Sequence, residues 1–218
     1  DYTLLKNIEK TFAKTLSLKT IFICDVLQTA GTLSDGGPSS KRAMIKAGIV
    51  SLKKDPKTKK FIPDTELGLT EPFYYSSPTV MYTSPNMISK HYSKTARKLT
   101  VKFNYSGYLS SFGKDAYYMP IDTIPIGKCV EGIEVANVKQ GLNVRTCYTR
   151  KLPLFFCEGI KGNNAYNGGM YFLPWFEDCK ESVITDADWY TLAGLEPDEI
   201  KIIEKWYKES YEKQPRTE

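Results

Sequence analysis

Histidine is nearly absent from this sequence, and its scarcity excludes many kinds of catalytic site. The chain has one histidine, His91, and its five cysteines include no CxxC pair. Structural zinc sites need clustered Cys and His ligands, and a Ser or Cys nucleophile usually relies on a histidine base. We therefore predict no metal and no cofactor, and the composition favours a protein that is not an enzyme.

Long apolar segments are lacking as well. The longest apolar stretches, such as Thr20–Cys24 and Leu152–Cys157, are far shorter than the roughly 18 residues that a membrane helix needs. We predict no membrane span. An odd number of cysteines without framework spacing fits a reducing compartment better than a secreted disulfide scaffold, and the localisation is otherwise open.

The composition is that of a folded protein with an uneven charge distribution. The chain has 218 residues, of which 41% are hydrophobic and 13% aromatic, which is enough for one large domain spanning 1–218. Its net charge is +5. Basic residues are in excess over 1–161 and acidic residues over 162–218. We interpret the acidic part as ordinary helical ion pairs, such as Glu204–Lys208.

Helical patterns lie near the two ends of the sequence. Residues 3–16 place Leu4, Ile8 and Phe12 on one stripe, which predicts an amphipathic helix. A helical C-terminal segment is expected over 186–212, with Pro197 at a first helical position.

The body between them, 20–160, reads as β-rich. Residues 97–105 give the clearest pattern, because apolar and polar residues alternate. Residues 53–60 predict an exposed turn, and the prolines of 62–86 predict extended segments over the surface. Further strands are expected at 20–27, 43–52, 117–119, 132–138, 143–149 and 152–157. The prediction is an α+β, β-rich fold with an antiparallel sheet or a barrel- or sandwich-like core.

Two basic stretches are the candidate functional surface. The first covers 41–60 and contains one acidic residue, Asp55. The second covers 90–102. Over 90–108 its cations are interleaved with Tyr92, Tyr105 and Tyr108, as in single-strand binding platforms. Such surfaces neutralise phosphates, so we predict a non-enzymatic domain that binds DNA or RNA. The candidate residues are Lys41, Arg42, Lys46, Lys53, Lys54, Lys57, Lys59, Lys60, Lys90, Tyr92, Lys94, Arg97, Lys98 and Lys102.

Two alternatives stay open from the sequence. Tyrosine-rich strands, proline-rich extended segments and Gly/Asn loops also suit a structural subunit of a viral or phage particle or another assembly, whose partners are copies of itself or other proteins. A metal-dependent nuclease-like hydrolase could use Asp64 and the Asp178-x-Lys180 pattern, although both patterns are short. No motif carries a resemblance to a known family.

Overall fold

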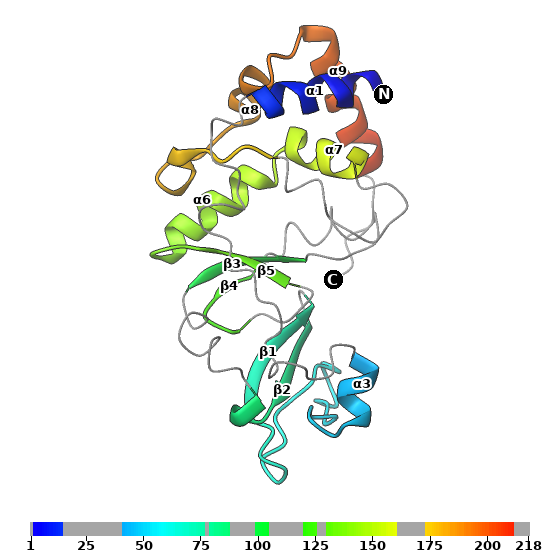
Figure 1. Cartoon of the computed structure of the whole chain (residues 1–218), viewed down its shortest axis with the longest axis vertical. Coiled ribbons are helices and arrows are strands. Elements are labelled where there is room, and N and C mark those ends of the chain that lie inside the picture. Colours follow the sequence, from blue (N-terminus) through cyan, green and yellow to red (C-terminus); the bar gives the residue numbers. More distant parts are fainter. Residues whose placement is uncertain are drawn as a thin grey trace. The chain divides into compact units, whose positions relative to one another are not determined.

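The computed structural model describes residues 2–14, 41–76, 79–87, 99–104, 120–125, 130–160 and 173–211 (Figure 1). These residues fall into two compact units. We call the first the helical unit; its described residues are 2–14, 135–160 and 173–211. The second, which we call the sheet unit, has as its described residues 41–76, 79–87, 99–104, 120–125 and 130–134.

The described residues of the helical unit lie mainly in short helices. A 3-10 helix, η4, precedes α8, and a π-helical turn, η5, continues α9. The elements are α1 (Tyr2–Lys14), α6 (Val138–Tyr148), α7 (Lys151–Ile160), η4 (Glu177–Lys180), α8 (Asp186–Leu192), α9 (Pro197–Trp206) and η5 (Tyr207–Tyr211). Helix α7 packs against α1, α8 and α9 (Figure 1).

The predicted N-terminal helix is confirmed over the described part of 3–16. Leu4, Ile8 and Phe12 are buried, as their spacing on one face of a helix requires. Lys6 and Lys10 on the other face are exposed. The apolar stripe therefore docks α1 onto the rest of the helical unit.

The predicted C-terminal helices are also confirmed, and local capping explains where they begin. Helix α8 starts with a reciprocal capping box between Thr185 and Asp188. Helix α9 starts with a second box between Glu196 and Glu199, and Pro197 occupies its first turn. Such boxes satisfy backbone N–H groups that no helical turn can reach.

The strand predicted at 143–149 is wrong, because these residues lie mainly in α6. Asn137 begins the helix, and its side chain accepts a hydrogen bond from the Gln140 N–H. Val144, Cys147 and Tyr148 are buried at helical spacing. Burial of this face overrides the strand preference of β-branched and aromatic residues.

The strand predicted at 152–157 is wrong for a different reason. The run is apolar on every side, and all six residues are buried within α7. A continuous apolar run does not distinguish a buried strand from a buried helix. Pro153 is tolerated because it lies in the first helical turn, where N–H groups have no helical acceptor.

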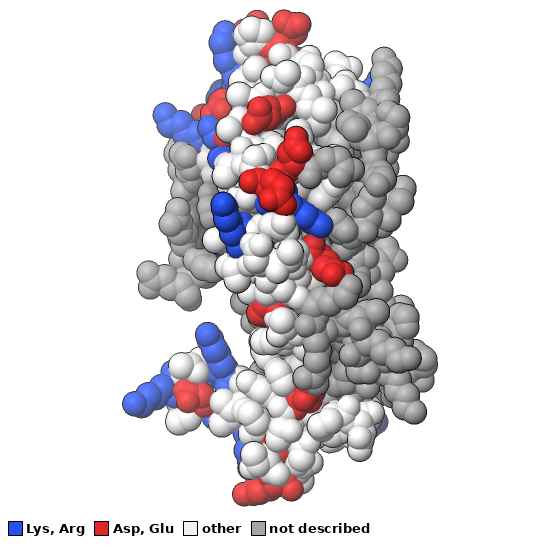
Figure 2. Space-filling view, turned by 90° about the vertical axis from the view of Figure 1, so that its left-hand side faces the viewer, with Lys and Arg blue, Asp and Glu red and all other residues white. Residues whose placement is uncertain are grey.

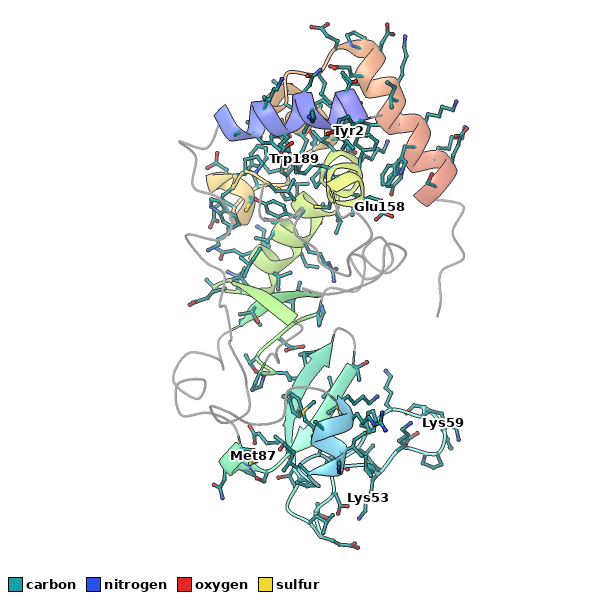
Figure 3. The ribbon with its side chains drawn as sticks, turned by 45° about the vertical axis from the view of Figure 1, so that its right-hand side comes forward. Tyr2, Lys53, Lys59, Met87, Glu158 and Trp189 are labelled. Carbon is teal, nitrogen blue, oxygen red and sulfur yellow. The ribbon has the colours of Figure 1, made fainter. Side chains whose placement is uncertain are left out.

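Trp189 lies at the centre of the helical unit (Figure 3). The rings of Phe12, Tyr148 and Phe176 lie roughly edge-on to it, with centroids 6.2, 5.7 and 4.8 Å away. Its indole N–H donates a 2.9 Å hydrogen bond to the Cys147 carbonyl. One side chain thus holds α1, α6 and α8 together by both packing and hydrogen bonding.

The sheet unit contains small antiparallel sheets. Strands β1 and β2 form a hairpin with a register shift between Tyr74 and Ser76, and β3 is the central strand between β4 and β5. The Tyr74 hydroxyl donates to the Asp122 carboxylate at 2.8 Å and so links β1 to β4. The strands are β1 (Glu71–Ser76), β2 (Thr79–Thr83), β3 (Thr100–Asn104), β4 (Ile121–Asp122) and β5 (Val130–Glu134), and a 3-10 turn, η2 (Pro85–Met87), follows β2.

The strand predicted at 43–52 is wrong at its start. Helix α3 (Lys41–Lys46) occupies this region and buries Met44. Gly48 then adopts a φ of 65°, and the Ile49 N–H donates to the Met44 carbonyl. A left-handed glycine is a common helix ending, so Gly48 marks the end of a helix rather than a position in a strand.

The extended structure predicted for 62–86 is confirmed by the β1–β2 hairpin, but its placement over the surface is wrong. Phe73, Tyr74 and Met81 are buried in the core of the sheet unit together with Met44 and Val50. Proline restricts a strand's hydrogen bonds without preventing burial of its neighbours. Pro72 is an example, because it lies within β1 next to the buried Phe73.

The α+β class and the antiparallel pairing are confirmed, whereas the β-rich description is wrong for the described residues, of which more lie in helices than in strands. The described strands form sheets of two and three strands and close no barrel.

The strand predicted at 97–105 is confirmed over β3, and the one at 132–138 overlaps the end of β5. The strands predicted at 20–27 and 117–119 lie outside the described residues. Within the described part, no helix has the length and apolarity needed to cross a membrane.

Substituting Trp189 by Phe tests the centre of the helical unit. The change leaves a gap and removes the donor to the buried Cys147 carbonyl, so the free energy of unfolding should fall by about 2–4 kcal/mol. Urea unfolding followed by circular dichroism measures this. The exposed Val183→Ala serves as control and should change the value by less than about 0.5 kcal/mol. Equal effects of the two substitutions would contradict the central role of Trp189.

Candidate nucleic-acid interface

The candidate residues of 41–60 all lie in the sheet unit, on two neighbouring pieces of structure. Lys41, Arg42 and Lys46 belong to α3. The remaining ones belong to a tight hairpin at residues 53–62, which we call the basic hairpin: Lys53, Lys54, Lys57, Lys59 and Lys60. The exposed turn predicted at 53–60 is confirmed, whereas its flanking residues form an isolated bridge rather than strands.

Backbone hydrogen bonds close the basic hairpin. The Ile62 N–H donates to the Lys53 carbonyl at 3.0 Å, and the Asp55 N–H donates to the Lys60 carbonyl at 2.9 Å. Lys54 and Phe61 form an antiparallel bridge between these bonds. The lysines are therefore carried on an ordered scaffold.

Asp55 organises the turn of this hairpin. Its carboxylate accepts hydrogen bonds from the Thr58 N–H at 2.6 Å, the Lys57 N–H at 2.9 Å and the Thr58 hydroxyl at 3.0 Å. The bonds from Thr58 are the main cause that holds the pKa of Asp55 below its ordinary value. The single acidic group among 53–60 is thus directed toward the backbone of its own turn.

Lys59 has an unusual backbone conformation. Its φ is 57°, and its N–H donates to the Asp55 carbonyl at 2.9 Å. This left-handed conformation costs an L-residue roughly 1–2 kcal/mol, and glycine is the residue that usually occupies it in such turns. A lysine therefore stands at a position where the backbone favours glycine.

Ser51 connects the basic hairpin to the sheet. It is buried, its hydroxyl donates to the Ile62 carbonyl at 2.7 Å, and its N–H donates to the Tyr82 carbonyl of β2 at 2.8 Å. The Lys53 N–H donates in turn to the Ser51 hydroxyl. Both strands of the hairpin are thereby fixed to the body of the sheet unit.

Lys53 is the member of the basic hairpin that has acidic partners. Its ammonium lies 3.0 Å from the Asp64 carboxylate and 3.3 Å from that of Glu66. The side chain of Asp64 is 8% exposed, and its contact with Lys53 holds its pKa below the ordinary value. This contact joins the base of the basic hairpin to the next turn, so we assign Lys53 a structural role.

Lys54 and Lys41 share an aromatic partner. Their ammonium groups lie 5.0 and 4.9 Å from the centroid of the Phe61 ring. Such cation–π contacts are favourable by about 0.5–1 kcal/mol at exposed sites. The Phe61 ring is therefore contacted by one cation from α3 and one from the basic hairpin.

The other three lysines of the basic hairpin extend away from the core. Lys57, Lys59 and Lys60 are exposed, and within the described part of the chain no hydrogen bond, ion pair or ring contact engages their ammonium groups. Figure 3 shows Lys59 at the outer end of the hairpin, and Figure 2 shows basic side chains on the projection at its lower left. Arg42 and Lys46 on α3 are exposed as well.

Most of the second basic stretch falls outside the part of the chain that the structure describes. Lys90, Tyr92, Lys94, Arg97 and Lys98 lie outside the described residues. Lys102 is in β3, opposite Gly132 of β5. Membership of these residues in the interface stays a prediction.

The residues of the nuclease alternative lie in different compact units. Asp64 is in the sheet unit, where Lys53 contacts its carboxylate. Asp178 is in η4 of the helical unit. The described residues include no group of three or more His, Cys, Asp or Glu side chains placed to hold a metal ion.

Sequence reasoning missed three residues that build the interface. The Asp55-Pro56 pair indicated a turn. It did not indicate that the Asp55 carboxylate would accept hydrogen bonds from the backbone, so that it does not pair with the neighbouring lysines of the hairpin. Ser51 and Phe61 carried no signal of their own, because their partners depend on how α3, the hairpin and β2 meet.

Lys59→Gly tests the conformation of the hairpin. Glycine relieves the left-handed strain but has more freedom in the unfolded chain, so the net stabilisation of the hairpin should be roughly 0.5–1 kcal/mol. Hydrogen exchange of the Ile62 amide measures this local stability. Lys57→Gly, at a position without positive φ, is the matched control and should destabilise the hairpin. Destabilisation by Lys59→Gly would contradict the assignment.

Asp64→Asn tests the contact with Lys53. A carboxyl whose pKa is lowered by folding stabilises the protein above its unfolded pKa of about 3.9, and this stabilisation is lost as the pH falls through the folded pKa. In the variant, the Leu69 amide should be less protected from hydrogen exchange than in the wild type at neutral pH. This difference in protection should shrink below about pH 4. Asp198→Asn, which removes an exposed ion pair with Lys201, is the control. A pH-independent difference at Asp64 would contradict the ion-pair interpretation.

Neither a protein-family model nor a curated protein nor a solved structure matches the chain.

Proposed function

We propose that the chain is a non-enzymatic nucleic-acid-binding protein that contacts phosphates through its basic hairpin. The observation that carries the proposal is the arrangement of Lys57, Lys59 and Lys60: three exposed ammonium groups on an ordered turn whose one carboxylate is engaged by the backbone. Preorganised cations lose little conformational freedom of the backbone on binding, which favours affinity. Arg42 and Lys46 of α3 extend the surface.

The proposed mode of binding is electrostatic. Base stacking needs a free aromatic face, and in the basic hairpin the Phe61 ring already contacts Lys41 and Lys54. Phosphate contacts carry little sequence information, so binding through this hairpin should tolerate changes of sequence. The stretch at 90–102, with Tyr92, remains the proposed source of any stacking contacts.

Reversing the charge of the three outward lysines tests the proposal. In Lys57→Glu/Lys59→Glu/Lys60→Glu the Kd for a fluorescent single-stranded DNA oligonucleotide should rise by about tenfold or more at low salt. The dependence of log Kd on log salt should flatten by up to about 2, since each phosphate contact on a single strand contributes roughly 0.7. Fluorescence anisotropy across a salt series measures both quantities.

Lys201→Glu/Lys205→Glu/Lys208→Glu is the matched control. It makes the same charge change on exposed residues of α9 and η5 in the helical unit, so it separates a local interface from an effect of net charge. Equal weakening in both variants would contradict the proposed interface. Absence of binding by the wild type to single- or double-stranded oligonucleotides at low salt would overturn the function itself.

The assembly alternative has one supporting observation. Val138 and Leu142 lie one turn apart on α6 and are 54% and 42% exposed, and apolar side chains on a surface favour protein contacts. Size-exclusion chromatography distinguishes the two functions, because association through apolar contacts survives high salt whereas phosphate binding does not.

A further inference from the structure

Two buried cysteines from distant parts of the sequence meet in the helical unit. Cys147 is in α6 and Cys179 is in η4, and both have 0% exposure. Both thiols are free in the structure. Each thiol lies close enough to the other to affect it electrostatically, and the segments that carry them pack together.

The packing of η4 on α6 explains why the two thiols meet. The Asn143 side-chain amide, one helical turn before Cys147, donates to the carbonyl of Lys180, which follows Cys179, at 2.9 Å. The Gln140 amide, about one turn earlier, donates to the Glu181 carboxylate at 2.6 Å. The two segments are thus held side by side (Figure 1), and α6 presents Cys147 to η4.

The surroundings keep this pair in the reduced form once the chain has folded. A thiol must lose its proton to react, and burial raises the pKa of Cys147, with the neighbouring Cys179 adding to the shift. An oxidant reaches the pair when η4 separates from α6 or before the two have packed. Oxidation is therefore expected mainly during folding.

We propose that Cys147 and Cys179 form a latent disulfide site, which closes when the chain folds in the presence of a disulfide oxidant such as oxidised glutathione. Two thiol–disulfide exchange steps join the two sulfur atoms. One glutathione disulfide is reduced to two glutathione thiols, which receive the two cysteine protons. The bond would fasten η4 to α6 and constrain the unfolded chain, which raises stability.

Oxidative refolding of the full chain tests the site. The reduced protein is unfolded in urea, refolded in a glutathione redox buffer, treated with an alkylating agent and mapped by mass spectrometry without reduction. The Cys147 and Cys179 peptides should be linked, with a mass lower by two hydrogen atoms, and the Tm should lie several degrees above that of the reduced protein.

Two variants separate this bond from other cysteine chemistry. Cys157→Ala, at a buried cysteine of α7, should leave the Cys147–Cys179 link in place. Cys179→Ala should abolish the link and make the Tm insensitive to oxidant. Alkylation of Cys147 and Cys179 after oxidative refolding, or linkage of either to another cysteine, would overturn the proposal.

Discussion

Buried polar groups must find hydrogen-bond partners, and both compact units are organised by side chains that meet this demand. In the helical unit the Trp189 indole donates to the Cys147 carbonyl, and the Tyr148 hydroxyl donates to the Pro174 carbonyl. In the sheet unit the Thr83 hydroxyl donates to the Ile49 carbonyl, and Ser51 joins the hairpin to β2. These contacts connect segments whose apolar burial alone would leave their register undetermined.

The same demand shapes the candidate interface. The turn of the basic hairpin leaves backbone N–H groups without strand partners. The Asp55 carboxylate accepts hydrogen bonds from two of these groups, those of Lys57 and Thr58. A carboxylate engaged in this way stays close to the backbone and is poorly placed to pair with the neighbouring lysines. The positive potential at the outer end of the hairpin therefore follows from the needs of the backbone as much as from the number of lysines.

The lysines of the first basic stretch differ in what they do, although they look equivalent in the sequence. Lys53 is an ion-pair partner of the buried Asp64, and Lys54 and Lys41 pack on Phe61. Lys57, Lys59 and Lys60 have no partner among the described residues, and they are the cations that we propose for phosphate binding. Burial and neighbours, rather than residue type, thus divide structural cations from candidate binding cations.

Local patterns in the sequence determined several parts of this protein. The stripe Leu4, Ile8, Phe12, the start of α9 at Pro197 and the turn at Asp55-Pro56 were readable because each depends on neighbours within a few residues. Tertiary structure decided the rest. The apolar run 152–157 became a helix, and the lysines acquired separate roles, because both depend on surfaces brought together from distant parts of the chain, and no short-range pattern encodes such a meeting.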